Sequence, residues 1–172
     1  MKPAHSVPAA SAGPWRAALA LALGLTVAGC GGNEPEPQPP MSLELGTGRQ
    51  QFTPLNDGDT LGLQRGCQGG QHIFVSLRAW GLPPEPVMVE LSLTRTEDEQ
   101  KVSSPFRVRY LFAQGNDLDA PDELTGLLLV IPEPDKAVGR AVRVTAAVQT
   151  DPGDRATHVR TGTLQWGADA CP

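Results

Sequence analysis

The sequence from residue 42 to residue 172 predicts an all-β domain with the architecture of an antiparallel β-sandwich. Apolar and polar residues alternate with a period of two in most of its apolar segments, as in half-buried strands. Clusters of Gly, Pro, Asn and Asp separate these segments, and no segment shows a convincing helical period. Eight or nine short strands favour an immunoglobulin-like or related Greek-key topology, and a small β-barrel is the alternative.

The predicted strands begin with short candidates and continue with clearer ones. Residues 42–48, 51–55 and 59–64 are the short candidates. Residues 71–80 alternate most clearly, and their predicted buried row is Ile73, Val75, Leu77 and Ala79. The opposite row consists of His72, Phe74, Ser76, Arg78 and Trp80. Because both faces of a strand cannot lie in one core, a loop covers Phe74 and Trp80, or they form an exposed patch that binds a partner. We expect the loop at residues 81–86 or at residues 115–123 to cover them.

The later segments complete the predicted sheets. Residues 86–95 and 140–150 alternate regularly, and residues 106–112 do so with Phe106, Val108, Tyr110 and Phe112 on the buried side. Residues 124–132 are apolar on both faces, which indicates a central strand. In residues 156–166 the alternation changes phase near Gly162, which predicts a β-bulge.

The N-terminal segment has the pattern of an export signal. A basic start, with Lys2 and Arg16, precedes an apolar run at residues 17–28 that is too short to span a bilayer comfortably. The run ends in Val27-Ala28-Gly29-Cys30, which resembles the lipobox of bacterial lipoprotein precursors. This resemblance implies cleavage after residue 29, acylation of Cys30 and anchoring to a membrane. An ordinary secretory signal with a chance cysteine is the alternative.

The resemblance also implies where the chain is held. Gly31 follows the cysteine instead of the aspartate that resembles an inner-membrane retention signal, so we expect an outer-membrane or surface location. Residues 30–41 are rich in Pro and Glu and predict an extended tether of about 30 Å, at about 3.1 Å per residue. The predicted organisation is a signal peptide at 1–29, a lipidated tether at 30–41 and a β-domain at 42–172.

Charge excludes one class of partner. Residues 31–172 carry 12 basic and 19 acidic side chains, a formal charge of −7. Such a domain repels polyanions, because binding phosphate backbones requires clustered Lys and Arg. We therefore expect no nucleic acid as a partner. The expected partners are the membrane, through the lipid anchor, and an envelope protein.

Two of the three cysteines are predicted to form a disulfide. Cys67 and Cys171 remain once the lipobox accounts for Cys30, and disulfides persist in exported chains. A bridge between them closes a loop of about 100 residues, worth about 4–5 kcal/mol in the chain-entropy model. Two free thiols are the alternative, and the absence of a C-x-x-C motif leaves redox and zinc sites without support.

Few residues offer catalytic or metal-binding chemistry. His72 and His158 need to meet, together with a carboxylate, to hold a metal, and two solvated strand histidines are the preferred interpretation. Four carboxylates between residues 116 and 123 are candidates for calcium, although a solvated acidic turn is preferred. These four are Asp117, Asp119, Asp122 and Glu123. We expect no cofactor and no enzymatic activity, since no nucleophile or zinc motif of a known hydrolase type occurs.

A wider resemblance covers residues 43–82. The stretches "DGDTL" and "QGGQH", followed by a predicted strand, resemble the start of a group of uncharacterised β-rich bacterial lipoproteins. The resemblance implies location and fold, but no activity, and Cys67 departs from its pattern. The first hypothesis is a lipid-anchored, non-enzymatic interaction or structural module of the cell envelope. The second is a lipoprotein that binds calcium or a small ligand through residues 116–123 or the turn at Gly66–His72.

Replacing Cys30 by serine tests the anchor. Cys30→Ser is expected to abolish acylation, because only the thiol accepts the lipid in processing of the lipoprotein type. Metabolic labelling with a palmitate analogue measures this, and equal labelling of both proteins contradicts the lipoprotein hypothesis.

Overall fold

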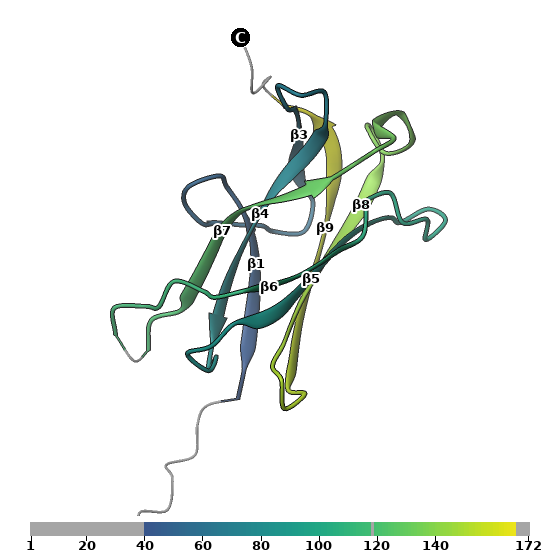
Figure 1. Cartoon of the computed structure of the whole chain (residues 1–172). Helices are drawn as coiled ribbons and strands as arrows, with labels where there is room; N and C mark the ends of the chain where they lie inside the picture. The colour runs from purple at the N-terminus through teal and green to yellow at the C-terminus, as the bar shows by residue number, and fades with distance from the viewer. Residues whose placement is uncertain (1–39, 118, 168–172) are drawn as a thin grey trace, which may run out of the picture. The chain divides into compact units, whose positions relative to one another are not determined.

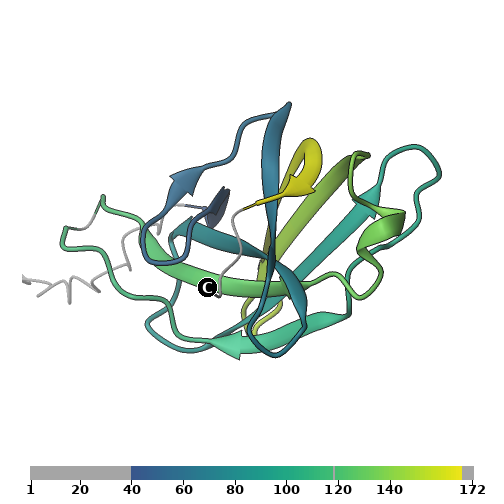
Figure 2. The same cartoon turned by 90° about the horizontal axis from the view of Figure 1, so that it is seen from above.

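The computed structural model describes residues 40–117 and 119–167, which form an all-β domain, as predicted. A strongly curled mixed sheet gives it the shape of a half-barrel (Figures 1 and 2). The structure has strands where the alternation predicts them, together with one short 3₁₀ turn, η1 (Pro134–Lys136). The strands are β1 (Ser42–Thr47), β2 (Thr53–Pro54), β3 (Asp59–Arg65), β4 (Gln71–Trp80), β5 (Val87–Arg95), β6 (Phe106–Tyr110), β7 (Asp122–Val130), β8 (Ala141–Gln149) and β9 (Arg155–Trp166).

Strand β4 organises the sheet. Along the main path the strand order is β2-β1-β4-β3-β9-β8-β5-β6, and β7 also pairs with β4. Strand β1 pairs with the second half of β4, from Ser76 to Trp80, and β3 pairs with its first two residues. Strand β3 then continues the sheet by pairing with β9.

The sheet is mixed, so the prediction of a wholly antiparallel arrangement is wrong. Strands β3 and β9 run parallel, from Asp59↔Gly162 to Leu63↔Trp166, whereas the other ladders are antiparallel. Parallel strands need a long connection between them, and β3 and β9 are far apart in the chain. Strand β9 runs antiparallel to β8 and parallel to β3.

The core forms from the predicted inward rows. In β4 the side chains of Ile73, Val75, Leu77 and Ala79 are each at most 1% exposed. The alternating apolar residues of β5 and β8 are equally buried. Each such Val, Leu or Ile contributes about 1.5–3 kcal/mol by leaving water, so the period-two pattern largely determines which face turns inward.

A bulge in β7 explains a buried polar residue. Val75 pairs with Leu127 but Leu77 pairs with Leu124, so β7 has one residue more than β4 between these pairs. Gly126 there has a φ of +73°, and a Cβ would lie 2.5 Å from the Arg49 carbonyl oxygen. Ser76, opposite the bulge, is fully buried, and its hydroxyl donates to the Gly48 carbonyl at 2.8 Å. The Gly126 N–H in turn donates to the Ser76 Oγ at 3.3 Å.

The predicted bulge in β9 is wrong. The β8–β9 register is unbroken from Ala141↔Thr163 to Gln149↔Arg155. Leu164 is buried in the core, whereas Val159 lies on the outer face and is 38% exposed. Gly162 is explained by close approach, because a Cβ there would lie 2.4 Å from the Asp59 carbonyl oxygen of β3.

Two further expectations fail at the sheet edges. Val108, predicted to be buried, is 41% exposed, because its strand β6 pairs with β5 alone in the described part of the chain. Phe112, from the same predicted row, is buried at 5% exposure. Strand β7 is not central either, because β4 is the one described strand with which it forms a ladder. Its other edge carries the isolated bridge Ala113↔Glu123 and a hydrogen bond from the Ser104 N–H to the Val130 carbonyl at 2.9 Å.

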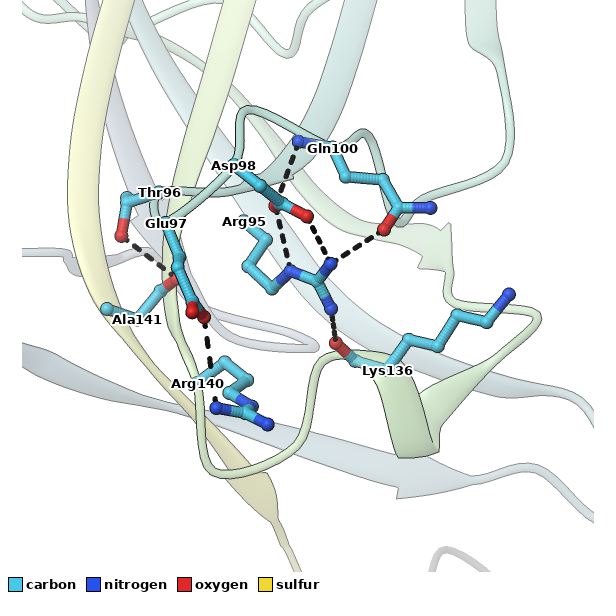
Figure 3. A network of polar contacts seen from close by, with 8 residues as sticks. All are labelled: Arg95, Thr96, Glu97, Asp98, Gln100, Lys136, Arg140 and Ala141. Carbon is cyan, nitrogen blue, oxygen red and sulfur yellow. Dashed lines mark hydrogen bonds and ion pairs between the residues drawn. The ribbon is translucent and has the colours of Figure 1, made fainter.

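A polar network fixes the turn after β5 (Figure 3). The Arg95 guanidinium bonds to the Asp98 carboxylate and donates to the Gln100 Oε1 and the Lys136 carbonyl, both at 2.7 Å. The hydrogen bond from Arg95 lowers the pKa of the Asp98 carboxyl to about 2. The network ties the end of β5 to the segment that contains η1.

Burial of the β4 row can be tested with a matched pair of substitutions. Val75→Asp places an unpaired carboxylate in the core at a cost of several kcal/mol, against a typical total stability of about 5–15 kcal/mol. We expect the domain to lose its cooperative thermal transition in near-ultraviolet circular dichroism. The control, Val159→Asp on the outer face, is expected to keep it, and similar behaviour of the two variants contradicts the assigned rows.

Candidate functional site

The predicted signal segment 1–29, the predicted lipidation site Cys30 and the predicted tether residues up to 39 lie outside the described residues. Cys67 lies in the turn between β3 and β4, and its predicted partner Cys171 is also outside the described part. The disulfide stays a prediction. Leu63 pairs with Trp166, and the Gly167 N–H donates to the Leu63 carbonyl at 2.8 Å. In the sequence, Cys67 follows Leu63 by four residues and Cys171 follows Trp166 by five residues. Leu63 and Trp166 are partners in the β3–β9 ladder.

The acidic residues near 120 have separate roles in the structure. The Asp122 Oδ1 accepts a hydrogen bond from the Gly115 N–H at 3.1 Å, and the Glu123 carboxylate accepts one from the Arg78 Nε at 2.7 Å. Asp117 and Asp119 lie exposed in the preceding turn. Across the described ranges, no three His, Cys, Asp or Glu side chains gather closely enough to hold a metal ion.

The Gly66–His72 segment forms a turn closed by its own backbone. The Gly66 N–H donates to the Gly70 carbonyl at 2.7 Å, and the Gly69 N–H donates to the Gly66 carbonyl at 2.9 Å. His72 follows on the outer face of β4, with its ring edge-on to Phe74 at 5.0 Å between centroids. His158 instead belongs to β9 and faces β1, so the two histidines do not form one site.

His158 binds the backbone of β1. Its Nδ1 accepts a hydrogen bond from the Leu45 N–H at 2.7 Å, and its side chain is half-buried. Burial lowers the pKa of the imidazole, and the positive charge of Arg160 lowers it further, whereas Glu44 and Asp57 oppose the shift. Arg160, two residues on, donates from Nε to the Leu55 carbonyl at 3.0 Å. These two polar side chains of β9 satisfy backbone groups on the chain from β1 to β3.

Apolar side chains gather on the outer face of β4 and β7. We define the outer apolar patch as His72, Phe74, Leu128 and Val130, which face one another in the pairs His72↔Val130 and Phe74↔Leu128. Leu128 is 47% and Val130 39% exposed, and Phe74 is half-buried. The patch lies beside the outer edge of β7, where the described contacts are the isolated bridge Ala113↔Glu123 and a hydrogen bond from the Ser104 N–H to the Val130 carbonyl.

The loop at residues 48–52 covers the adjoining part of this face. It lies over the middle of β4, where Gly48 accepts from Ser76 and the Arg78 guanidinium stands 4.2 Å from the centroid of the Phe52 ring. The Arg49 guanidinium stands 5.8 Å from the centroid of the Phe74 ring. Of the expected covers, neither 81–86 nor 115–123 provides these contacts. Phe74 therefore has a polar border on one side and the exposed Leu128 on the other.

Comparison with known proteins finds no family model that matches the chain and no curated protein similar to it in sequence. Within residues 40–117 and 119–167, no helix is long and apolar enough to span a membrane. The functional interpretation therefore depends on the geometry of the domain and on the N-terminal sequence.

Sequence reasoning found half of the outer apolar patch. The alternation placed Phe74 and His72 on the outer row, and both lie there. Leu128 and Val130 were not assigned to the patch, because residues 124–132 are apolar on both faces and give no signal for the exposed side. The exposure of β7 depends on pairing with residues about 50 positions away, which the local pattern does not encode.

The His158 hydrogen bond predicts a pH-dependent stability. A folded-state pKa below the unfolded value of about 6.5 means that the unfolded chain binds the proton more readily. The free energy of unfolding is therefore highest above that pH and falls as the pH is lowered toward the folded pKa. His158→Gln is expected to flatten the pH dependence of the free energy of unfolding between pH 8 and pH 5, measured by urea denaturation against the unmodified chain.

At pH 8 the same bond contributes about 1 kcal/mol, a typical net value for one hydrogen bond. His158→Leu is expected to remove this contribution. An unchanged pH slope in His158→Gln contradicts the role given to Nδ1.

The disulfide prediction is tested on the exported protein. Peptide mapping without reduction is expected to recover one cross-linked pair, Cys67–Cys171. Two thiols that alkylate in the native, unreduced protein contradict it.

Proposed function

We propose that this chain is a lipid-anchored lipoprotein of the bacterial cell envelope whose β-domain is a non-enzymatic interaction or structural module. The outer apolar patch is the observation that carries the interaction role. The Val-Ala-Gly-Cys motif ending at Cys30, the apolar run before it and the Pro/Glu-rich tether support the anchored location. Gly31 favours the outer membrane or the cell surface.

The patch has the physical properties of a contact surface. On one face of β7 the side chains of Leu127 and Leu129 are buried in the core. On the opposite face the side chains of Leu128 and Val130 are exposed to water. Apolar surface bordered by polar groups is characteristic of interfaces, and Arg49 supplies such a border beside Phe74. A partner that covers the patch removes this apolar surface from water, which stabilises the complex by about 25 cal/mol per Å².

We also propose that the half-barrel is a form of β-sandwich, with an immunoglobulin-like or related Greek-key arrangement. Two groups of strands support this proposal, β1, β4 and β7 on one side and β9, β8, β5 and β6 on the other. Their buried rows belong to one core cluster, and β3 connects the groups by pairing with both.

The alternative function is binding of a small ligand. The acidic turn offers no gathered set of calcium ligands within the described residues. A groove lined by Lys101, Arg107 and Arg155 favours a small anion instead.

The interface is tested by cross-linking from the patch. A photoreactive amino acid at position 128 is expected to give a discrete adduct in intact cells that carry the full chain. The same group at position 159, which is exposed on the other half of the sheet, serves as the control. Equal labelling from both positions, or none from position 128, contradicts the interface.

Phe74→Ser then separates contact from stability. Truncation of a fully buried aromatic side chain lowers the free energy of unfolding by about 3 kcal/mol or more. Truncation of a side chain that contacts only a partner leaves the melting temperature of the free domain nearly unchanged. Because Phe74 is half-buried beside the exposed Leu128, we expect a small thermal shift and a weaker adduct from position 128. A large fall in melting temperature contradicts the interface role of Phe74.

A further inference from the structure

A second surface feature lies on the outer face of β5, β6 and β8. It is an open groove of about 290 Å³, which we call the cationic groove. Three basic side chains line it, Lys101, Arg107 and Arg155, together with the single acidic side chain of Glu90. The small side chains of Ser92, Thr145 and Ala147 also line it.

The strand register brings these residues together. Glu90 of β5 pairs with Arg107 of β6 on one side and with Ala147 of β8 on the other. In the adjacent row of the same face, Ser92 pairs with Thr145. Because Ser92, Thr145 and Ala147 are short, they leave the space between the longer charged side chains open.

Glu90 positions two guanidinium groups at once. The Arg107 Nε lies 3.2 Å from the Glu90 Oε1, and the Arg155 Nη2 donates to the Glu90 Oε2 at 2.7 Å. A guanidinium has five N–H donors, so each arginine keeps most of its donors for another acceptor. The Lys101 ammonium forms no ion pair with the described residues, and its positive charge acts on Glu90.

The groove is a local exception to the charge of the domain. Its three cations and one carboxylate leave a formal excess of two positive charges, in a domain (residues 42–172) that carries 12 basic and 17 acidic side chains, a formal charge of −5. A phosphate monoester carries about −1.5 to −2 charges at pH 7 and three strong acceptor oxygens, which matches this excess and the three cations. The planar guanidinium of arginine can donate two parallel hydrogen bonds to phosphate oxygens, and the ammonium of lysine binds phosphate as a point charge.

We propose that the cationic groove binds a small molecule that carries a phosphate monoester group. The phosphate is held by Lys101, Arg107 and Arg155, with Glu90 as a positioning residue for the two guanidinium groups. Ser92 and Thr145 provide hydroxyl groups for the polar part of the same molecule. The volume of the groove suits a phosphate with a few attached carbon atoms, since it lies near the lower end of the range for ligand sites.

Size and charge separate this ligand from a polyanion. A long polyanion meets the negative field of the whole domain, whereas a small dianion meets the local field of the groove. The groove involves different strands from the outer apolar patch, so the proposal does not depend on the interaction role of that patch.

The experiment uses the full chain, purified in nonionic detergent, with inorganic phosphate as the probe. Amide signals of the labelled protein are followed by nuclear magnetic resonance at constant ionic strength. Saturable shifts are expected at Ser92 and Thr145, with a Kd of about 1 mM or tighter. Shifts that do not saturate, or that spread evenly over the surface, overturn the proposal.

Matched substitutions locate the binding. Lys101→Gln and Arg107→Gln are each expected to weaken binding at least about fivefold, because each removes one charged contact. The controls Lys136→Gln and Arg140→Gln make the same charge changes outside the groove and are expected to keep the affinity of the unmodified chain. Arg107 is 65% exposed, so its replacement leaves the melting temperature nearly unchanged. If the groove variants and the controls weaken phosphate binding equally, the binding reflects the overall charge of the chain, and this result overturns the proposed site.

Discussion

The division of one edge of β4 between two strands is the constraint on which the rest of the domain depends. Strand β1 pairs with the second half of this edge and β3 with its beginning, so the sheet continues from β4 in two directions. Strand β3 then leaves β4 and pairs in parallel with β9, which carries the sheet round into the half-barrel. The buried rows of β4, β5 and β8 meet inside this curl, and their apolar burial stabilises it.

Polar side chains form hydrogen bonds with backbone groups at the positions where the strand ladders end. Where β1 has no ladder to β9, the imidazole of His158 accepts from the Leu45 N–H, and Arg160 donates to the Leu55 carbonyl. At the bulge of β7, the Ser76 hydroxyl links Gly48 to Gly126. An unpaired buried backbone group costs about 1–3 kcal/mol, so these contacts permit the irregular strand junctions that the curl requires.

The curl also gives the domain two outer faces with different chemistry. The face of β4 and β7 is apolar beside an edge that carries no ladder in the described residues, whereas the face of β5, β6 and β8 holds three cations around Glu90. An apolar face suits a macromolecular contact, since it gains most from exclusion of water. The charged groove suits a small anion, because opposite charges attract more strongly over short distances. A single domain thus presents two outer surfaces of different chemistry.

The sequence by itself determined the all-β class, the position of each strand and the buried rows of β4, β5 and β8. These features depend on alternation between neighbouring residues, which burial of one strand face enforces locally. The tertiary structure alone decided that β7 is an edge strand and that residues 48–52 cover part of β4. It likewise decided that His158 binds β1 and that Arg160 binds the Leu55 carbonyl. It also brought Glu90 to Arg155, 65 positions along the chain. Such features require the pairing of distant strands, and a local pattern of apolar and polar residues carries no information on which strands pair.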